Sequence, residues 1–398
     1  MNYLSDKGYV AIGVQTDENT AVKPNVFLPF IEEDLSTDLN NERVKQIVGI
    51  EWKSNLILQG QRKHGGKIKI LCDPDNIGHL LNMAMKIGSS TGSGSVGYTH
   101  PFTVDTPNYY TIEVLKGNAV HRYVGCRIDK LVFSFENGNL IAEAEIVAKY
   151  KFNYGTLKTA LTGAGMVAVV FDEQYDPEPC FGLVATDVIQ VWEAGVATDV
   201  TVATIVAGNK SITMSATAIT ATAGALITLK GQTPSYATIK RPFKLGQCLV
   251  GFGADDTAAL ANVASYALAT ALDDFKLTIE RGTVQRNASG KNDPLVITGI
   301  GDAELTTKKL FENAADLQQY NDIAKKACVI KFTGDNIATT YYSSLTITLY
   351  NIKAKKADNK IKSGEYVYDE TDYFVEYDNG DAKAIEISLI NSTAGASY

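Results

Sequence analysis

An alternation of apolar and polar side chains over residues 139–152 constrains the fold of this chain more than any other feature. Leu140, Ala142, Ala144, Ile146 and Ala148 would share one side of an extended strand, with Glu143, Glu145 and Lys149 on the other. A period of two predicts a β-strand with one buried and one solvated face. Segments 109–117 and 121–138 are rich in β-branched and aromatic residues and are bounded by turn residues, as in hairpins. The expected fold is mainly β, within the α+β class.

Two parts of the chain, residues 49–185 and 243–398, show a similar order of strands, turns, one helix and hairpins. In the first part a helix is expected over 74–87, with Asp73 as cap and Gly88 as stop. In the second part a helix is expected over 307–320. Its apolar side would consist of Leu310, Phe311, Ala314 and Leu317. The shared order suggests a duplication that gives two similar β units, although any α+β chain can show such an order.

Two further segments differ in composition from these units. Residues 1–48 contain turn-forming and polar residues around a short apolar stretch, without sustained periodicity, and are expected to form an extended N-terminal arm. Residues 186–242 are rich in Thr, Ala, Val and Ile and nearly free of charge. They are expected to form a small inserted β module, outside the main assembly.

The charge balance argues against a protein that grips nucleic acid through its phosphates. The 398 residues include 37 Lys and Arg against 45 Asp and Glu, a net charge of -8. The five cysteines are scattered and odd in number, which predicts reduced, mostly buried thiols rather than a disulfide framework. Neither a secretory signal nor an apolar stretch of membrane-spanning length is visible, so assembly in a cytoplasm is expected.

Catalytic chemistry is weakly indicated, and the chain is not expected to be an enzyme or to need a cofactor or metal. The four histidines lie in separate segments, without the spacing of a zinc motif or of a nucleophile partner. Gly92, Gly94 and Gly97 spell GxGxxG, but after a helix and before strands, the reverse of a dinucleotide site. The acidic run over 369–381 lacks the spacing of a calcium loop, and Asp378 is expected to open a hairpin turn.

The order of several segments resembles the tail tube (major tail) proteins of tailed bacteriophages. In the first part these are FLPF, DPDNIGHLL, THPFTV, YYTIEV and YVGCRIDKLVFSF; in the second they are PFKLGQCLVGFG, DDFKLTIERG and GIGDAELTTKKLFEN. Each is only a strand or helix pattern, and their order carries the weight. The 186–242 segment departs from that pattern and resembles small β modules that decorate phage structural proteins.

The resemblance implies a β-barrel or sandwich flanked by helices, whose sheets join side by side around a ring. It implies a structural virion protein of the phage tail, assembled in the host bacterium. Stacked rings would form the tube through which the tape measure protein and DNA pass, with tail tip or baseplate and tail terminator proteins at its ends. A duplicated subunit predicts rings of three with pseudo-six-fold symmetry; otherwise six subunits are expected. The arm and a long hairpin loop would link successive rings.

The acidic balance suggests how such a conduit would work, because unpaired carboxylates in the lumen repel phosphates. Candidate lumen residues are Glu143 and Glu145, with Asp274 and Glu280 as their counterparts in the second part. The alternative is that these carboxylates belong to a solvated outer surface. Other classes that remain open are a surface adhesin or carbohydrate-binding β protein, and a tube or hub component of a related injection system.

Overall fold

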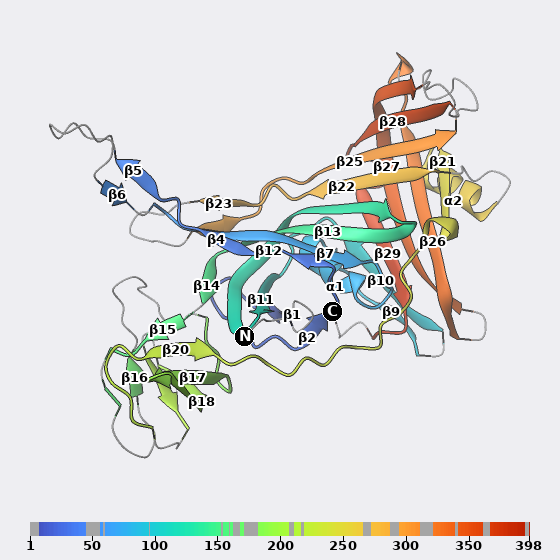
Figure 1. Ribbon diagram of the computed structural model, residues 1–398. Coiled ribbons are helices and arrows are strands. Elements are labelled where there is room, and N and C mark those ends of the chain that lie inside the picture. Colours follow the sequence, from blue (N-terminus) through green and yellow to red (C-terminus); the bar gives the residue numbers. More distant parts are fainter. Residues whose placement is uncertain are drawn as a thin grey trace.

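The structure, a computed structural model, is mainly β and is drawn in Figure 1. It describes residues 8–44, 56–58, 60–94, 96–152, 154–158, 160–161, 168–170, 182–206, 211–215, 219–265, 272–286, 294–310, 321–338, 341–360, 367–394 and 398. These residues form one large curved antiparallel assembly of strands and one smaller β module. The large assembly has one hydrophobic core, and the module forms a second core together with Val120, Val124, Tyr150 and Phe152 of the large assembly.

One continuous antiparallel ladder, here called the main sheet, runs through the large assembly. Its order, from one end to the other, is β3 (Glu32–Glu33) and β4 (Ser36–Asp38), β7 (Lys63–Leu71), β13 (Asn139–Ala148), β12 (Ala119–Glu136), β22 (Asp274–Glu280), β25 (Asp302–Leu310), β28 (Tyr368–Val375), β27 (Tyr341–Lys360), β26 (Lys326–Ala338) and β21 (Cys248–Gly253). The order joins the two halves of the sequence, because β12 pairs directly with β22. The halves therefore share one sheet.

Two long strands of the main sheet, β12 and β27, also pair with strands outside the main sheet. The first part of β12 pairs with β14 (Tyr150–Phe152) and β11 (Tyr109–Lys116), and β11 continues to β1 (Tyr9–Gln15) and β2 (Val26–Leu28). The first part of β27 pairs with β29 (Ile385–Asn391), which continues to β10 (Gly97–Thr103), β8 (Lys86–Ile87) and β9 (Thr91–Ser93). Register shifts in both strands accompany the change of partners.

The large core contains the inward side chains of the main sheet together with α1 (Ile77–Ala84). The alternation predicted for β13 is confirmed for Leu140, Ala142, Ala144 and Ile146, which are buried, and for Glu143 and Glu145, which are half-exposed. It is wrong for Lys149, which was expected on the solvated face but is buried and donates a 2.5 Å hydrogen bond to Glu18. At the start of α1, Asp73 accepts hydrogen bonds from the backbone N–H groups of Asp75 and Asn76, both 3.0 Å. The helix is shorter than the expected 74–87, because β8 pairs its last residues with β10.

The second helix lies elsewhere than predicted. The expected helix over 307–320 is wrong for residues 307–310, which belong to β25 and pair with β22 and β28; residues 311–320 lie outside the described part. Instead, α2 (Asp256–Ala264) begins at Asp255, whose side chain accepts a 2.7 Å hydrogen bond from the N–H of Ala258. A short 3₁₀ helix, Leu245–Gln247, precedes β21. Helix α2 packs against β21.

The smaller module is a six-stranded sheet. Its order is β15 (Tyr154–Thr156), β20 (Leu226–Leu229), β17 (Val188–Glu193), β18 (Val196–Ile205), β19 (Ser211–Met214) and β16 (Ala168–Val170). It begins before the expected boundary at 186, because Tyr154 pairs with Thr228. From Lys230 to Arg241 the chain has little regular structure on its way back to the main sheet.

The N-terminal segment is not an extended arm over its whole length. Strand β1 is enclosed between β2 and β11, and its residues Tyr9–Ile12 are buried. The part that does project is the hairpin of β5 (Glu42–Val44) and β6 (Leu56–Leu58), which extends away from both cores in Figure 1. A further two-stranded element pairs β23 (Val284–Arg286) with β24 (Leu295–Ile297).

Candidate assembly surfaces

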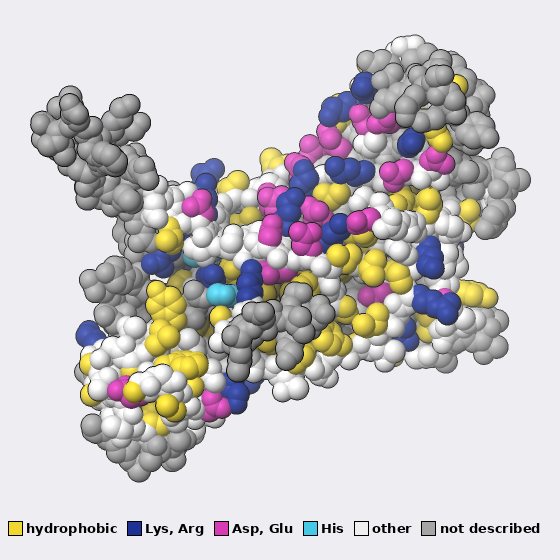
Figure 2. Space-filling model, in the orientation of Figure 1, with side chains coloured by type: hydrophobic (Ala, Val, Ile, Leu, Met, Phe, Trp, Pro, Cys, Tyr) yellow, Lys and Arg dark blue, Asp and Glu magenta, His cyan; other side chains and the backbone are white. Residues whose placement is uncertain are grey.

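The outward side of the main sheet carries a band of mixed charge, here called the charged face. Figure 2 shows acidic and basic side chains intermingled over the middle of the molecule, where β13, β22 and β25 run in Figure 1. The strands are buried on alternate positions, so their charged residues share the other side. The charged face is defined by Lys67, Lys130, Glu143, Glu145, Asp274, Glu280, Glu304, Lys353 and Lys355.

Register brings the four expected carboxylates to this one face. Glu145 lies opposite Lys130, and Lys130 lies opposite Glu280 in the next strand. Glu143 and Asp274 are separated from Glu145 and Glu280 by even numbers of residues, so they point to the same side. Residues from the two halves of the sequence therefore meet on one surface.

The carboxylates of the charged face are not uniformly unpaired, which corrects the expected picture of a purely repulsive acidic surface. Glu143 accepts a 2.7 Å hydrogen bond from Lys67, and Glu280 accepts one of 2.5 Å from Lys130. These bonds raise the pKa of both lysines. Burial raises the pKa of the Asp274 carboxyl. The pairing arises because lysines occupy cross-strand positions that only the sheet register defines.

The main sheet has open edges at both ends within the described residues. Strand β21 pairs there only with β26, and β3 and β4 pair only with β7. Unpaired N–H and C=O groups on such edges are templates for another strand. The hairpin of β5 and β6 is a third surface available to a neighbouring molecule.

The small module is fastened to the large assembly by a buried ionic cluster, here called the Arg122 cluster. Arg122 in β12 donates from Nη2 to Glu113 in β11 at 2.7 Å, and from Nη1 to Asp187 before β17 at 2.5 Å. Tyr9 donates to Glu113 at 2.5 Å, and Gln232 donates to the same carboxylate at 3.1 Å. Burial alone would lower the pKa of Arg122, but Asp187 and Glu113 raise it. Sequence reasoning missed this cluster, although Glu113 and Arg122 are charges in otherwise apolar strands.

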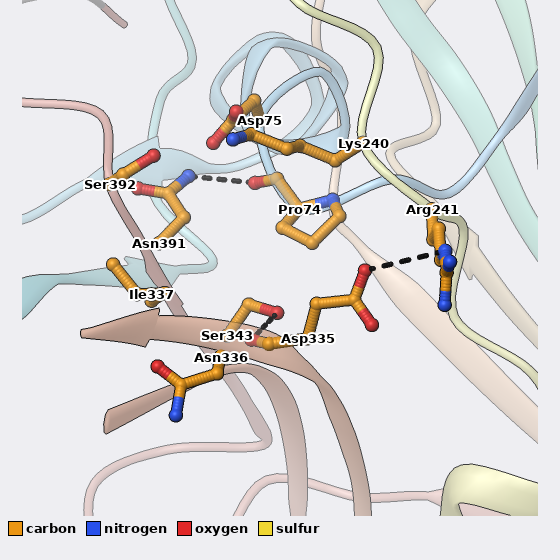
Figure 3. Close-up of a pocket in the computed structure, with 10 residues that line it drawn as sticks. All are labelled: Pro74, Asp75, Lys240, Arg241, Asp335, Asn336, Ile337, Ser343, Asn391 and Ser392. Atoms are coloured by element: carbon orange, nitrogen blue, oxygen red, sulfur yellow. Dashed lines mark hydrogen bonds and ion pairs between the residues drawn. The ribbon is translucent and has the colours of Figure 1, made fainter. Parts of the chain in front are cut away.

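A small pocket lies between the turn before α1, the returning segment after the module, and β26–β27 (Figure 3). Figure 3 shows Arg241 and Asp335 facing each other across it, with 3.9 Å between Nε and Oδ2. Deeper in, Asn391 donates to the carbonyl of Pro74 at 2.7 Å, and Ser343 donates to that of Asp335 at 3.0 Å. Since these polar groups mostly bond one another, the pocket is a seam between segments rather than a reaction centre.

Two of the four histidines, and two glycines of the GxGxxG pattern, have structural roles. His79 is buried in α1, and burial lowers its pKa to about 4. His100 is also buried and hydrogen-bonds Ser90 and Asn391. Gly92 and Gly97 have positive φ angles in the β9–β10 hairpin, a turn rather than a phosphate loop.

No group of three or more His, Cys, Asp or Glu side chains could hold a metal within the described part of the chain. Cys72, Cys126, Cys248 and Cys328 are free thiols, and all but Cys248 are fully buried. Among the described helices, none is long and apolar enough to cross a membrane. Asp378 lies in a turn closed by a bridge to Lys383 and accepts a 2.8 Å bond from the N–H of Gly380. The turn does not join a hairpin of the flanking strands, because β28 pairs with β25 and β27 whereas β29 pairs with β27 and β10.

A mainly β chain with open sheet edges and a projecting hairpin in its described residues fits the class of structural proteins. The comparison with families makes the identification specific. A family model described as "Phage tail tube protein" matches residues 5–373. Because the match covers nearly the whole sequence, this chain belongs to the phage tail tube protein family, and is a structural protein of the bacteriophage tail. A search of curated proteins gives no match.

Proposed function

We propose that this chain polymerises into rings that stack to form the tube of a phage tail, through which the genome is ejected. The observation that carries the proposal is the main sheet, which joins both halves of the chain and has open edges at β21 and at β3 and β4 in the described residues. Closing a ring would pair such edges and remove them from solvent. Family membership supports the same use.

The ring is proposed to contain three chains with pseudo-six-fold symmetry, each supplying two β units, or else six chains. Support for the trimer is that a strand leading into a helix occurs twice, as β7 with α1 and as β21 with α2. Native mass spectrometry of one isolated ring separates the two cases, since its mass will be three or six times the 43.0 kDa subunit mass. A cryo-EM section with six identical chains contradicts the trimer.

The charged face is proposed to line the channel, with Glu143, Glu145, Asp274 and Glu280 toward the passing DNA. Half-exposed lysine pairs would moderate the repulsion without creating a row of free cations. The tape measure protein would occupy the channel before ejection, and tip and terminator proteins would bind the end rings. Assembly is proposed to occur in the host cytoplasm.

Negative-stain microscopy of the purified full chain tests the proposal most directly. Hollow tubes or stacked rings of uniform diameter are expected as protein concentration is raised. A chain that stays monomeric at high concentration, with a native circular dichroism spectrum, contradicts polymerisation. A solid, non-hollow filament contradicts the conduit while leaving self-association intact.

A further inference from the structure

Two buried arginines, Arg127 at the centre of β12 and Arg281 just after β22, line a second pocket of the large assembly. Both residues are more than nine-tenths buried, with 6% and 4% of their surfaces exposed. The rest of the lining comes from Glu18, Thr106, Tyr109 and the segment 295–299. Burying two guanidinium groups in one place is costly unless negative charge compensates them.

Protein groups accept only some of the hydrogen bonds that these two guanidinium groups can donate. Arg127 donates to Thr298 Oγ1 at 2.7 Å and to the carbonyl of Pro107 at 3.1 Å, and its guanidinium lies 3.6 Å from the centre of the Tyr109 ring. Arg281 donates to the carbonyl of Asp105 at 2.7 Å. The buried Nε of Arg127, and Nε and Nη1 of Arg281, have no hydrogen-bond partner in the structure as described.

The carboxylates nearest the pocket are engaged elsewhere. Glu18 accepts a 2.5 Å bond from Lys149, and Asp105 accepts a 3.1 Å bond from Lys86. Neither forms an ion pair with Arg127 or Arg281 among the described residues. Burial, and for Arg281 the neighbouring charge of Arg127, lower the pKa of both guanidinium groups. Glu18, which lines the pocket, and Asp105 offset part of this positive charge, but each carboxylate also pairs with a lysine. Within the described residues, neither guanidinium group has a carboxylate of its own.

The Arg122 cluster provides a comparison within the same chain, because it also contains a buried arginine. There a single guanidinium is held by two carboxylates, Glu113 and Asp187. At the second pocket, neither guanidinium group forms a direct ion pair with a carboxylate of the described residues, although Glu18 and Asp105 lie near them. All three arginines are buried, so the two sites differ in the ion pairs that carboxylates form with the guanidinium groups.

We propose that Arg127 and Arg281 form a binding site for an oxyanion, a phosphate or carboxylate group held in the pocket by the two guanidinium groups. Arginine suits such groups because its planar fork of donors matches their oxygens. The anion is either free in solution or a carboxylate carried by a neighbouring copy of this chain. The inference does not depend on the tube assignment, since the site lies within one chain.

Isothermal titration of the unassembled full chain with inorganic phosphate, at ionic strength held constant with chloride, tests the site. Wild type is expected to bind one phosphate. Arg281→Met and Arg281→Lys are expected to weaken binding roughly tenfold or more, because each removes charge-assisted hydrogen bonds. Arg241→Met is the matched control, since its side chain is 82% exposed at the other pocket. Near-UV circular dichroism establishes that each variant is folded.

The two sources of the anion are separated by repeating the titration on assembled material. A free anion predicts that tubes and subunits bind phosphate equally. A neighbour's carboxylate predicts that subunits bind phosphate, tubes do not, and Arg281→Met impairs assembly. The site is contradicted if wild-type subunits bind no phosphate, if folded Arg281→Met binds it as well as wild type, or if Arg241→Met weakens binding as much as Arg281→Met does.

Discussion

Arg122 of the large assembly and Asp187 of the small module are joined by two hydrogen bonds in a fully buried pair. Nη1 of Arg122 lies 2.5 Å from Oδ2 of Asp187, and Nη2 lies 3.0 Å from Oδ1. Arg122 is part of the main sheet, whereas Asp187 precedes the first central strand of the small module. Because the same arginine also holds Glu113, the module is fixed to the large assembly by charge as well as by the hydrophobic core that it shares with β12 and β14.

The first prediction concerns that pair. Arg122→Met leaves two carboxylates buried without their cation, and is expected to lower the free energy of unfolding by about 3–5 kcal/mol. Asp187→Asn is expected to cost less, because Glu113 still balances the guanidinium. Urea unfolding followed by circular dichroism measures both. Lys230→Met, which breaks the exposed pair with Asp199 in the same module, is the control and should cost about 0–1 kcal/mol. Equal losses for Arg122→Met and Lys230→Met would contradict the role of the cluster.

A second prediction follows from the buried imidazole of His79. Burial lowers its folded-state pKa from 6.5 to about 4, so between these pH values the unfolded chain binds more protons than the folded one. Stability is therefore expected to fall as pH drops from 6.5 toward 4, by up to about 1.4 kcal/mol per pH unit from this group. His79→Phe, which keeps a ring against Tyr398, should flatten that slope. Urea midpoints at pH 7, 6 and 5 measure it. An unchanged slope in the variant would assign the acid sensitivity to other groups, such as His100.

A third prediction tests the contact between α2 and β21. A Cβ placed on Gly251 would lie 2.3 Å from the carbonyl oxygen of Ala259, too close for the helix to stay in place. Gly251→Ala is therefore expected to destabilise the chain by roughly 1–3 kcal/mol. Gly246→Ala is the control, since nothing lies within 4 Å of its added Cβ. Thermal unfolding of both variants should differ clearly; similar midpoints would show that α2 moves away without cost.

The sequence predicts a feature well where one strand alone determines it. The alternation at Leu140–Ala148 predicts both the buried and the solvated face of β13. In a strand with one solvated face, the local pattern identifies the two faces without information about the neighbouring strands. In β1, buried residues follow one another over Tyr9–Ile12, so the sequence shows no alternation there and does not predict a strand. The burial of β1 comes from β2 and β11, which are distant partners.

The sequence does not predict features that depend on strand register, or segments where the helical and strand periodicities of apolar residues compete. Thr307 and Leu310 begin a helical pattern, yet they extend β25, because ladders on both sides satisfy the backbone there. The lysine partners of Glu143 and Glu280 come from strands 76 and 150 residues away. Helix α2 was missed even though Asp255 is a good N-cap, because its apolar face consists mainly of small residues. Arg127 and Arg281 carry no local signal, since their proximity results from the pairing of β12 with β22.

The β5–β6 hairpin gives a fourth prediction, which depends on the proposed stacking of rings. At its base Asn40 donates a 2.5 Å hydrogen bond to the carbonyl of Gln61, so the two ends are already close. Replacing residues 42–58 by a short Gly-Ser linker should leave the cores folded. Rings are expected to form, but not to stack into tubes. Negative-stain microscopy distinguishes the outcomes, and normal tubes from the shortened chain would exclude the hairpin from stacking.

The fifth prediction tests whether the charged face lines the channel. Glu143→Lys with Glu145→Lys replaces two carboxylates by ammonium groups beside Lys67 and Lys130. Both positions are half-exposed, so the loss of stability is expected to be small, on the order of 1 kcal/mol. Rows of lysine repeated along a tube would bind phosphates and release their counterions, and so slow ejection, most strongly at low salt. Phage carrying the changes, with tails first shown intact by microscopy, should therefore eject DNA more slowly than wild type. Glu193→Lys with Asp199→Lys in the small module changes the charge equally away from this face and should leave the rate unchanged. If both double variants eject at the wild-type rate at every salt concentration, the charged face lies outside the channel.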